Sequence, residues 1–349
     1  MKLERNKNID YSTTVELEGV DSNIDPKDLY KLFSMLQNPY KNNIGSIVRE
    51  ITSNCFDSHI EAGVDDAVVI TIDKDESGFY ISFKDVGVGL SKERINNIYV
   101  NYLSSTKENS NDFIGAFGIG SKSPLSYQDI FYINTTYEGV HYNYIMRVGE
   151  TTPRVEKLME TPIDERNGTE IKIYIKDGTP SNDNYRLGDI GLFIKECKRQ
   201  LFYFDNVYFN ISEKVKQLYN NKNSYNSYSY YNSSNSGNID EKLPSNEYSV
   251  YEGEHFKFRT SDIYPFSSLH LCIGKVAYPI DWDQLGETPI DMNIALKFNI
   301  GELPIIQTRE DIRYNDESIN IIRKKIELVK NEIAQLYNKQ DFISNDTVQ

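Results

Sequence analysis

The chain has 349 residues, of which 39% are hydrophobic and 26% charged, and its formal net charge is −14 at pH 7. This length allows two domains, because single hydrophobic cores stop growing at roughly 250 residues. The acidic balance argues against direct binding to nucleic acid or anionic membranes, which are approached through excess Lys and Arg. It does not exclude a site for a single nucleotide, which needs only local donors and a metal.

The cysteines and the hydropathy pattern point to a cytoplasmic protein. Cys55, Cys197 and Cys272 are widely separated, which favours neither a disulfide framework nor a zinc site. The first ten residues lack the apolar segment of a signal peptide, and no stretch approaches the ~18 apolar residues of a membrane span. We therefore expect a reducing compartment and no transmembrane segment.

Helix and strand signals alternate along the first half of the chain. The longest helix is expected over 44–62, with Gly63 as its C-cap, and a shorter helix begins after the N-cap Ser91. The polar residues 101–111 indicate a mobile loop. A further helix is expected over 26–36, and strands are expected over 13–17, 67–72, 79–84, 130–137, 142–148 and 169–175.

The second half contains a biased segment and a strong closing helix. Residues 219–238 are almost wholly Tyr, Asn, Ser and Gly, which predicts an insertion or disordered loop. A base-stacking platform is the less favoured alternative, because Lys222 is its only basic residue. Strands are expected over 268–277 and 293–300. The closing helix repeats Ile319, Ile322, Ile326, Val329, Ile333 and Leu336 at steps of three and four.

The first candidate site element is the polar face of the helix over 44–62. Glu50, Asn54 and Asp57 stand at i, i+4 and i+7 and therefore share one face. A carboxylate can take a proton from water, while an amide oxygen one turn away can hold Mg²⁺. The alternative is a solvated helix face.

The second element is the loop Asp85-Val86-Gly87-Val88-Gly89, which follows the strand over 79–84. A carboxylate at a strand end can accept a hydrogen bond from an exocyclic amino group such as that of adenine. Gly87 and Gly89 allow the backbone to approach a flat ring closely. A plain turn between strand and helix is the alternative, because Asp and Gly are both favoured there.

The third element is the glycine-rich run over 114–123. Gly115, Gly118 and Gly120 precede a predicted helix and can present backbone N–H groups to phosphate oxygens. Their spacing is neither that of a Walker A loop nor that of the dinucleotide-binding fingerprint. A flexible surface turn is the alternative for this run taken alone.

These elements, in this order, resemble a known superfamily. REITSNCFDS, DVGVGLS, IGAFGIGSKS and NGTEIKIYI resemble the four motifs of the gyrase, heat-shock-chaperone, histidine-kinase and MutL (GHKL) ATPases, over residues 20–176. RINNIYVNYLSSTK is especially similar to the chaperone branch. The resemblance implies an α+β fold, with a Bergerat-type α/β sandwich that binds ATP and Mg²⁺.

The resemblance also implies roles for individual residues. Glu50 would be the general base, Asn54 the Mg²⁺ ligand and Asp85 the adenine reader, supported by Thr169. Because histidine kinases of this superfamily generally lack the hydrolytic glutamate, Glu50 disfavours a kinase. The remaining nucleotide contacts would come from Asp57, Gly87, Gly89, Asn97, Lys107, Gly115, Phe117, Gly118, Ile119 and Gly120.

The second half resembles the transducer or middle domain of gyrases and chaperones, a ribosomal S5 domain 2-like α/β fold. The basis is the stretch Leu303-Pro304-Ile305-Ile306-Gln307-Thr308-Arg309-Glu310 before a long helix. Gln307 and Arg309 would then reach the γ-phosphate across the domain boundary. An ordinary surface loop with an ion-paired Arg is the alternative. We divide the chain into domains at 1–185 and 186–349, with the insertion at about 219–238 in the second.

The arrangement of an ATPase domain and a transducer, together with the stretches IGAFGIGSKSPLSY and GELPIIQTRED, most resembles the bacteriophage rapid-lysis A (rIIA) proteins and their phage relatives. We expect a Mg²⁺-dependent ATPase in which ATP closes a lid, two chains associate, and hydrolysis releases the homodimer. The partner would be a host or phage protein. One alternative is a nucleotide-gated binding module with negligible hydrolysis. Another, resting on net charge alone, is an acidic inhibitor of a host DNA-binding protein.

Overall fold

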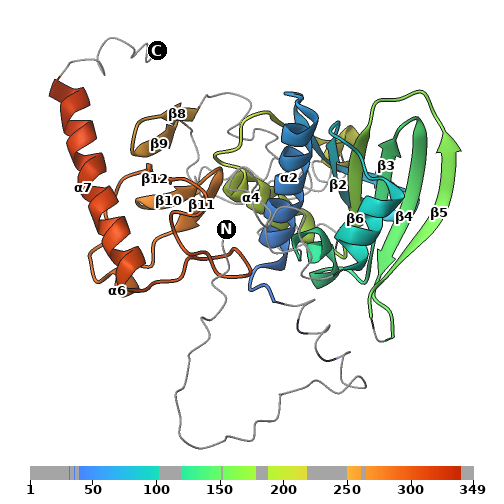
Figure 1. Ribbon diagram of the computed structural model, residues 1–349, viewed down its shortest axis with the longest axis horizontal. Helices are drawn as coiled ribbons and strands as arrows, with labels where there is room; N and C mark the ends of the chain where they lie inside the picture. The colour runs from blue at the N-terminus through green and yellow to red at the C-terminus, as the bar shows by residue number, and fades with distance from the viewer. Residues whose placement is uncertain are drawn as a thin grey trace, which may run out of the picture.

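The computed structural model describes Lys31, Met35 and residues 39–101, 119–150, 152–177, 188–217, 250–260 and 265–338. It contains two β-sheets with helices packed on them, joined near the centre of the molecule (Figure 1). The expected strand over 13–17, most of the expected helix over 26–36, and the biased segment 219–238 lie outside the described residues.

The first sheet has seven strands in the order β5-β4-β3-β6-β2-β1-β7. Neighbouring strands are antiparallel except β1 and β7, which are parallel. The strands are β1 (Val68–Asp75), β2 (Gly78–Asp85), β3 (Ile130–Tyr137), β4 (Val140–Arg147), β5 (Arg154–Pro162), β6 (Gly168–Tyr174) and β7 (Val207–Ile211). Five of the seven correspond to strands predicted from the sequence.

One face of this sheet is covered by helices. α2 (Asn43–Ala62) packs against α4 (Gly188–Gln200) and against the 3₁₀ segment η3 (Gly120–Ser126). Ile47, Ile51 and Cys55 on α2 are buried against the sheet, as the helical spacing of the apolar residues predicts. The helix-covered face of the sheet therefore carries the core, and Glu50 of α2 lies at the polar border of this core.

Two predicted helix boundaries are confirmed by their capping geometry. α2 ends at Gly63, which adopts the left-handed conformation at φ 67° that glycine adopts without strain. α3 (Lys92–Ile95) begins at Ser91, whose hydroxyl accepts a hydrogen bond from the Arg94 amide. α3 continues into η2 (Asn96–Val100), a π-helix of one turn.

Two elements that follow residue 185 are part of the first sheet and its helical layer. α4 packs on α2, and β7 pairs with β1 from Val68 opposite Val207 to Ile72 opposite Ile211. The domain boundary that the sequence analysis places at residue 185 thus precedes both elements. Parallel pairing between strands this far apart in sequence leaves no local signal, which is why β7 was not anticipated.

The second sheet has five strands in the order β11-β10-β12-β9-β8. The strand predicted over 268–277 is wrong as a single element, because it is two strands of a hairpin. Gly274, at φ 63°, supplies the left-handed residue of the turn. The elements are β8 (Val250–Glu252), β9 (Phe256–Arg259), β10 (His270–Ile273), β11 (Val276–Pro279), α6 (Trp282–Leu285), β12 (Ala295–Phe298) and α7 (Asp316–Asn338).

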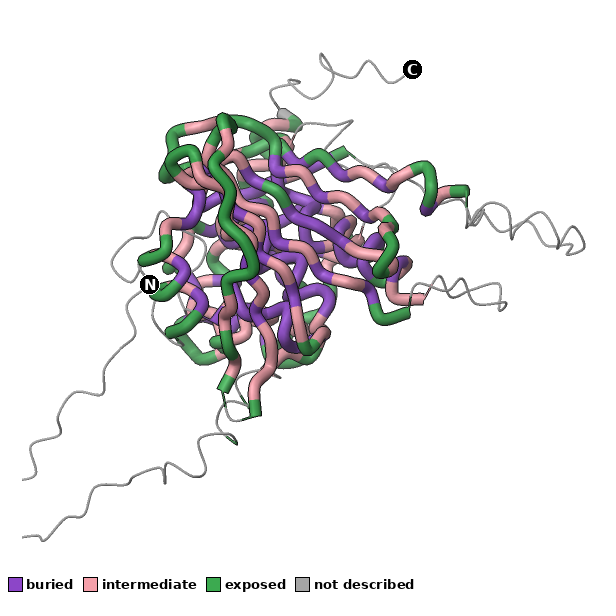
Figure 2. The backbone as a smooth tube through the Cα atoms, turned by 90° about the vertical axis from the view of Figure 1, so that its right-hand side faces the viewer, coloured by how far each residue is buried: buried purple, intermediate pink, exposed green. Residues whose placement is uncertain are grey.

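Burial follows this architecture. Along the inner strands β1 and β3, buried residues alternate with half-buried ones over most of the length, whereas the edge strand β5 is mostly exposed (Figure 2). In α7, Ile322, Ile326 and Val329 are buried, which confirms the helix expected from their spacing. No helix among the described residues is long and apolar enough to cross a membrane.

Candidate nucleotide-binding site

Glu50 lies where α2 meets the loop before α7. Its side chain is on α2 and only 4% exposed. Arg309 Nη1, from the loop before α7, donates to Glu50 Oε2 at 2.9 Å, and Arg49 Nε donates to Glu50 Oε1 at 3.2 Å. Each carboxylate oxygen therefore has an arginine partner, as a buried carboxylate requires.

Arg309 reaches Glu50 from a tight loop. The Arg309 amide donates to Ile306 O at 2.9 Å, and the Ile306 amide donates to Asp311 O at 3.1 Å. Arg309 is one of the described non-glycine residues with positive φ, at 55°. The loop therefore holds Arg309 in a conformation that an L-residue adopts at a cost of roughly 1–2 kcal/mol.

The environment of this ion pair is protein-lined rather than solvated. Burial lowers the pKa of Arg309, but the negative charge of Glu50, with smaller contributions from Tyr278 and Asp57, raises it by more. Burial also raises the pKa of Tyr40 and of Tyr278, whose hydroxyls lie in the field of the same charges. The guanidinium therefore keeps its charge at any physiological pH.

Asn54 and Asp57 continue the polar face of α2. Asn54 is half-buried, and Asp57 is fully buried. This face is thus not the solvated helix surface that was the alternative to a site. Asp57 lies close enough to Arg309 to raise its pKa.

Asp85 lies at the end of β2, beneath the start of the following loop. Its Oδ1 accepts hydrogen bonds from the Gly87 amide at 2.9 Å and from Ser58 Oγ at 3.1 Å. Burial raises the pKa of Asp85 to about 6, against the opposing effects of these hydrogen bonds and of the Thr169 amide. The Cys55 thiol also hydrogen-bonds to this buried carboxylate and likewise lowers its pKa.

The two glycines of this loop make close contacts with the protein's own chain. A Cβ at Gly87 would lie 2.6 Å from the Ser58 carbonyl oxygen, so only glycine lets the loop rest on α2. Gly89 has φ 70°, and a Cβ there would lie 2.2 Å from Thr136 O. The sequence predicts that both glycines allow a flat ring to approach, but the structure already requires them for packing.

Gly120 is the described end of the glycine-rich run. A Cβ at Gly120 would lie 2.4 Å from Glu50 Oε2, so this glycine is in direct contact with the carboxylate. Ile119 is buried beside it. Two residues on, the buried Lys122 ammonium donates to Ile98 O and to Asn101 O, which ties η3 to the end of η2. Burial lowers the pKa of Lys122 to about 8.

The remaining predicted residues are placed less closely together. Thr169 pairs with Asp85 across β6 and β2, and its hydroxyl lies 3.1 Å from Thr135 Oγ1. Its support of Asp85 therefore comes through its amide rather than its hydroxyl. Asn97 and Gln307 are exposed. Lys107, Gly115, Phe117 and Gly118 lie outside the described residues.

Sequence reasoning missed several residues that position this site. His59 Nε2 accepts a hydrogen bond from the Val86 amide at 3.0 Å, and Ser58 Oγ accepts one from the Val88 amide at 3.2 Å. Ser58 lies eight residues after Glu50, so helical spacing could have placed it near the polar face. Arg49 gave no signal, because nothing local shows which partner a buried arginine finds.

Mg²⁺, which the resemblance implies, fits this donor set only together with a nucleotide. Among the described residues, no group of three or more His, Cys, Asp or Glu side chains could hold a metal by itself. Mg²⁺ commonly takes one or two protein oxygens and completes its shell with phosphate oxygens and water. The half-buried Asn54 amide oxygen, one turn from Glu50, is of the required type.

Two buried hydroxyl groups near the site have unused hydrogen-bonding capacity. Ser123 Oγ, three residues after Gly120, and Thr308 Oγ1, next to Arg309, have no hydrogen-bond partner within the described structure. Buried polar atoms are rarely left unpaired, and an absent ligand or ion is one reason for such exceptions. Both hydroxyls could donate to phosphate oxygens or water.

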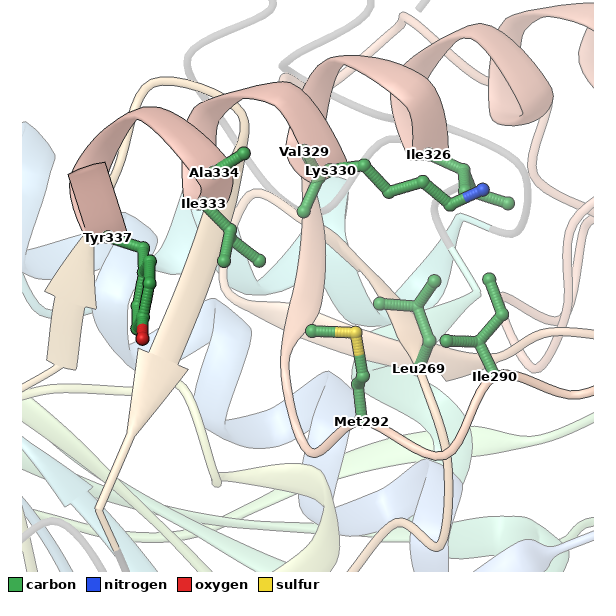
Figure 3. A pocket seen from close by; sticks show the side chains of 9 residues that line it. All are labelled: Leu269, Ile290, Met292, Ile326, Val329, Lys330, Ile333, Ala334 and Tyr337. Atoms are coloured by element: carbon green, nitrogen blue, oxygen red, sulfur yellow. The ribbon is translucent and has the colours of Figure 1, made fainter.

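Two cavities lie among the described residues, one apart from the site and one at Asp85. One, of about 420 Å³, is lined by Leu269, Ile290 and Met292 and by apolar side chains of α7 (Figure 3). Lys330 is the only charged residue of its lining, which is otherwise almost wholly apolar. The other, of about 280 Å³, is lined by Asp85 and Thr169 together with Lys84, His141 and Glu170. Neither cavity contains Glu50.

Comparison with known proteins agrees with the geometry of the first sheet. Residues 43–178 match the family described as histidine kinase-, DNA gyrase B-, and HSP90-like ATPase. The matched segment covers less than half of the chain but includes Glu50, Asp85 and Gly120. It supports the GHKL superfamily for this segment, and the mixed α+β arrangement of sheet and helices fits such an ATPase domain. No curated protein matched the chain.

Proposed function

We propose that this chain, through the GHKL ATPase-like segment 43–178, binds ATP and hydrolyses it at Glu50. The observation that carries the proposal is the position of one carboxylate. Glu50 is in contact with Gly120 of the glycine-rich run and is ion-paired with Arg309 from the loop before α7. The proposed base, Glu50, thus contacts both the proposed phosphate loop and the proposed cation, Arg309.

Asp85 selects the base of the nucleotide in this proposal. The adenine amino group donates to its carboxylate, which already accepts from Ser58 and Gly87. Thr169 supports Asp85 from the paired strand. A base with a carbonyl in place of that amino group would leave the buried carboxylate facing an acceptor, which disfavours it.

The phosphates lie over the N-terminus of η3 and the polar face of α2. The Gly120 amide and its neighbours in the glycine-rich run donate to phosphate oxygens. Asn54 holds Mg²⁺, which supplies neutralisation of phosphate charge when it is bound. The proposal retains the nucleotide contacts that the sequence predicts for five further residues, which are Asn97, Lys107, Gly115, Phe117 and Gly118.

Hydrolysis proceeds by transfer of a phosphoryl group to water. Glu50 accepts a proton from a water molecule, the water oxygen bonds to the γ-phosphorus, and the bond to the bridging oxygen of ADP breaks. Arg309 stabilises the charge on the transferring group. The ion pair between Arg309 and Glu50 must open first, because a carboxylate held by two arginines is a poor base.

That requirement favours a second candidate function. With both Glu50 oxygens engaged, ATP could shift Arg309 toward its γ-phosphate without rapid turnover. The chain would then act as a nucleotide-gated binding module, in which the movement of the second sheet is the output. Turnover by the purified protein separates the two functions.

Further proposals rest on the resemblance to GHKL ATPases. In them the second sheet and α7 act as the transducer-like domain, ATP favours closure and association of two chains, and hydrolysis releases them. The proposed setting is a phage protein of the rIIA type that acts in the host cytoplasm on a host or phage partner. The loop of Gln307 and Arg309, which contacts α2, supports the proposed coupling.

Glu50→Gln tests the proposed reaction. The amide keeps the size of the side chain but cannot accept the proton, so kcat for ATP should fall by about 10²–10⁴-fold. The Kd for a non-hydrolysable ATP analogue should change little. Full turnover in Glu50→Gln would exclude Glu50 as the base. Binding without turnover in the wild type would favour the gated module.

A further inference from the structure

Glu310 connects the loop that carries Arg309 to the beginning of α2. Its Oε2 accepts a hydrogen bond from the Lys41 amide at 2.9 Å, and its Oε1 accepts one from the Asn42 amide at 2.7 Å. Ser46 Oγ lies 3.4 Å from the same Oε1. Residues 41 and 42 immediately precede α2, where Asn42 is the N-cap.

This contact suits both groups chemically. Backbone amides at a helix start lack partners within the helix, and a carboxylate there is favoured by the helix dipole. Each Glu310 oxygen takes one of two successive amides, which fixes the carboxylate in position as well as satisfying the donors. The Asn42 side chain separately caps the Gly45 amide.

Three consecutive residues of the loop contact α2 or its N-cap. Thr308 O accepts from Arg49 Nη2 at 2.9 Å, Arg309 reaches Glu50, and Glu310 holds the residues before the helix. The middle residue has the left-handed backbone, which must be maintained by its neighbours. Glu310 and Thr308 thus fix the loop on either side of Arg309.

We propose that Glu310 is a positioning residue for the ATPase reaction. It anchors the loop to the start of α2 and thereby sets where the Arg309 guanidinium lies relative to Glu50 and the γ-phosphate. Glu310 touches neither nucleotide nor the reacting atoms. This inference rests on the proposed function, since it concerns the geometry of that same site.

A kinetic cycle tests the proposal. Glu310→Gln removes the charge and one acceptor oxygen, so the loop should no longer hold Arg309 in its position. The kcat should therefore fall by about 10- to 100-fold. The Kd for the non-hydrolysable ATP analogue should stay within about twofold, because Asp85 and Gly120 are untouched. Glu317→Gln, an exposed carboxylate in the first turn of α7, is the matched control and should keep wild-type kcat.

The double variant distinguishes positioning from a cap that only stabilises the fold. If Glu310 acts through Arg309, Glu310→Gln should cause little further loss of kcat when Arg309 is already Ala. Equal losses in both backgrounds, or an unchanged kcat in Glu310→Gln, would overturn the proposal.

Hydrogen exchange provides a readout that does not depend on turnover. The Lys41 and Asn42 amides should exchange faster in Glu310→Gln than in the wild type, and unchanged exchange would contradict the contact itself. A wild-type protein without ATPase activity would contradict both the proposed function and this inference. Wild-type turnover combined with an active Glu310→Gln would remove this inference alone.

Discussion

Arg309 and Glu50 form a buried ion pair at 2.9 Å although they are 259 positions apart in the sequence. The pair joins the loop before α7 to α2, and Arg49 completes it at the second Glu50 oxygen. Buried ion pairs contribute little net stability, because desolvation offsets much of their attraction. The desolvation cost of this ion pair is better explained by function than by stability. The base and the cation of the proposed reaction restrain each other until a phosphate competes for Arg309.

Arg309→Ala should lower kcat for ATP by about 10²–10³-fold, because the charge developing on the transferring phosphoryl group loses its cation. Affinity for a non-hydrolysable analogue should change by less than tenfold. Arg309→Lys, which keeps the charge but not the planar guanidinium, should recover part of the lost kcat. Equal kcat for wild type and Arg309→Ala in a coupled assay would rule out this role.

Gly120→Ala should lower kcat more than it weakens nucleotide binding. Its new Cβ would lie 2.4 Å from Glu50 Oε2, so the carboxylate must shift away from its present position. Glu50→Asp shortens that side chain by one methylene and removes the clash. Gly120→Ala should therefore cost less kcat in the Glu50→Asp background than in the wild type. Equal costs in both backgrounds would place the effect of Gly120 elsewhere.

The raised pKa of Asp85, about 6, makes stability depend on pH in a defined direction. The folded protein binds a proton that the unfolded chain lacks between the ordinary Asp pKa and about 6. The free energy of unfolding should therefore fall as pH rises through this window, by about 3 kcal/mol from this group. Chemical denaturation of wild type and Asp85→Asn at pH 4 and pH 7 measures it, and only the wild type should show this contribution. A constant difference between the two proteins would contradict it.

His270 should act in the opposite sense. Burial lowers its pKa to about 4, with Tyr203 Oη 2.8 Å from Nε2 and Nδ1 bonded to Ser268 O. The unfolded chain takes up a proton near the ordinary His pKa, while the folded protein resists it. Unfolding should thus become easier as pH falls from about 6.5 to about 4, by about 3 kcal/mol from this group. His270→Gln should lose that part of the acid sensitivity in the same denaturation series, and an unchanged acid sensitivity would exclude His270 as its source.

The sequence predicted the parts of the site that depend on local patterns. The helix of α2 with its Gly63 cap, the strand before Asp85 and the Ser91 cap follow from periodicity and capping chemistry, which act within a few residues. Glu50 and Asn54 could be placed on one face for the same reason.

The contacts that complete the site depend on the tertiary fold. The ion pair of Arg309 and Glu50 and the contact of Glu310 with Asn42 each join distant segments, so no local pattern reveals them. β7 could not be predicted for the same reason, because its five residues form a strand only through their pairing with β1. The resemblance placed Arg309 at the nucleotide, while the structure adds that it already engages the proposed base.

Titration calorimetry with a non-hydrolysable ATP analogue and Mg²⁺ tests the central claim most directly. We expect saturable binding with one site per chain, and an affinity at least tenfold weaker in Asp85→Asn, whose amide can present a donor to the adenine amino group. No measurable binding by the wild-type chain would contradict the assignment of Asp85, Gly120 and Glu50 to an ATP site.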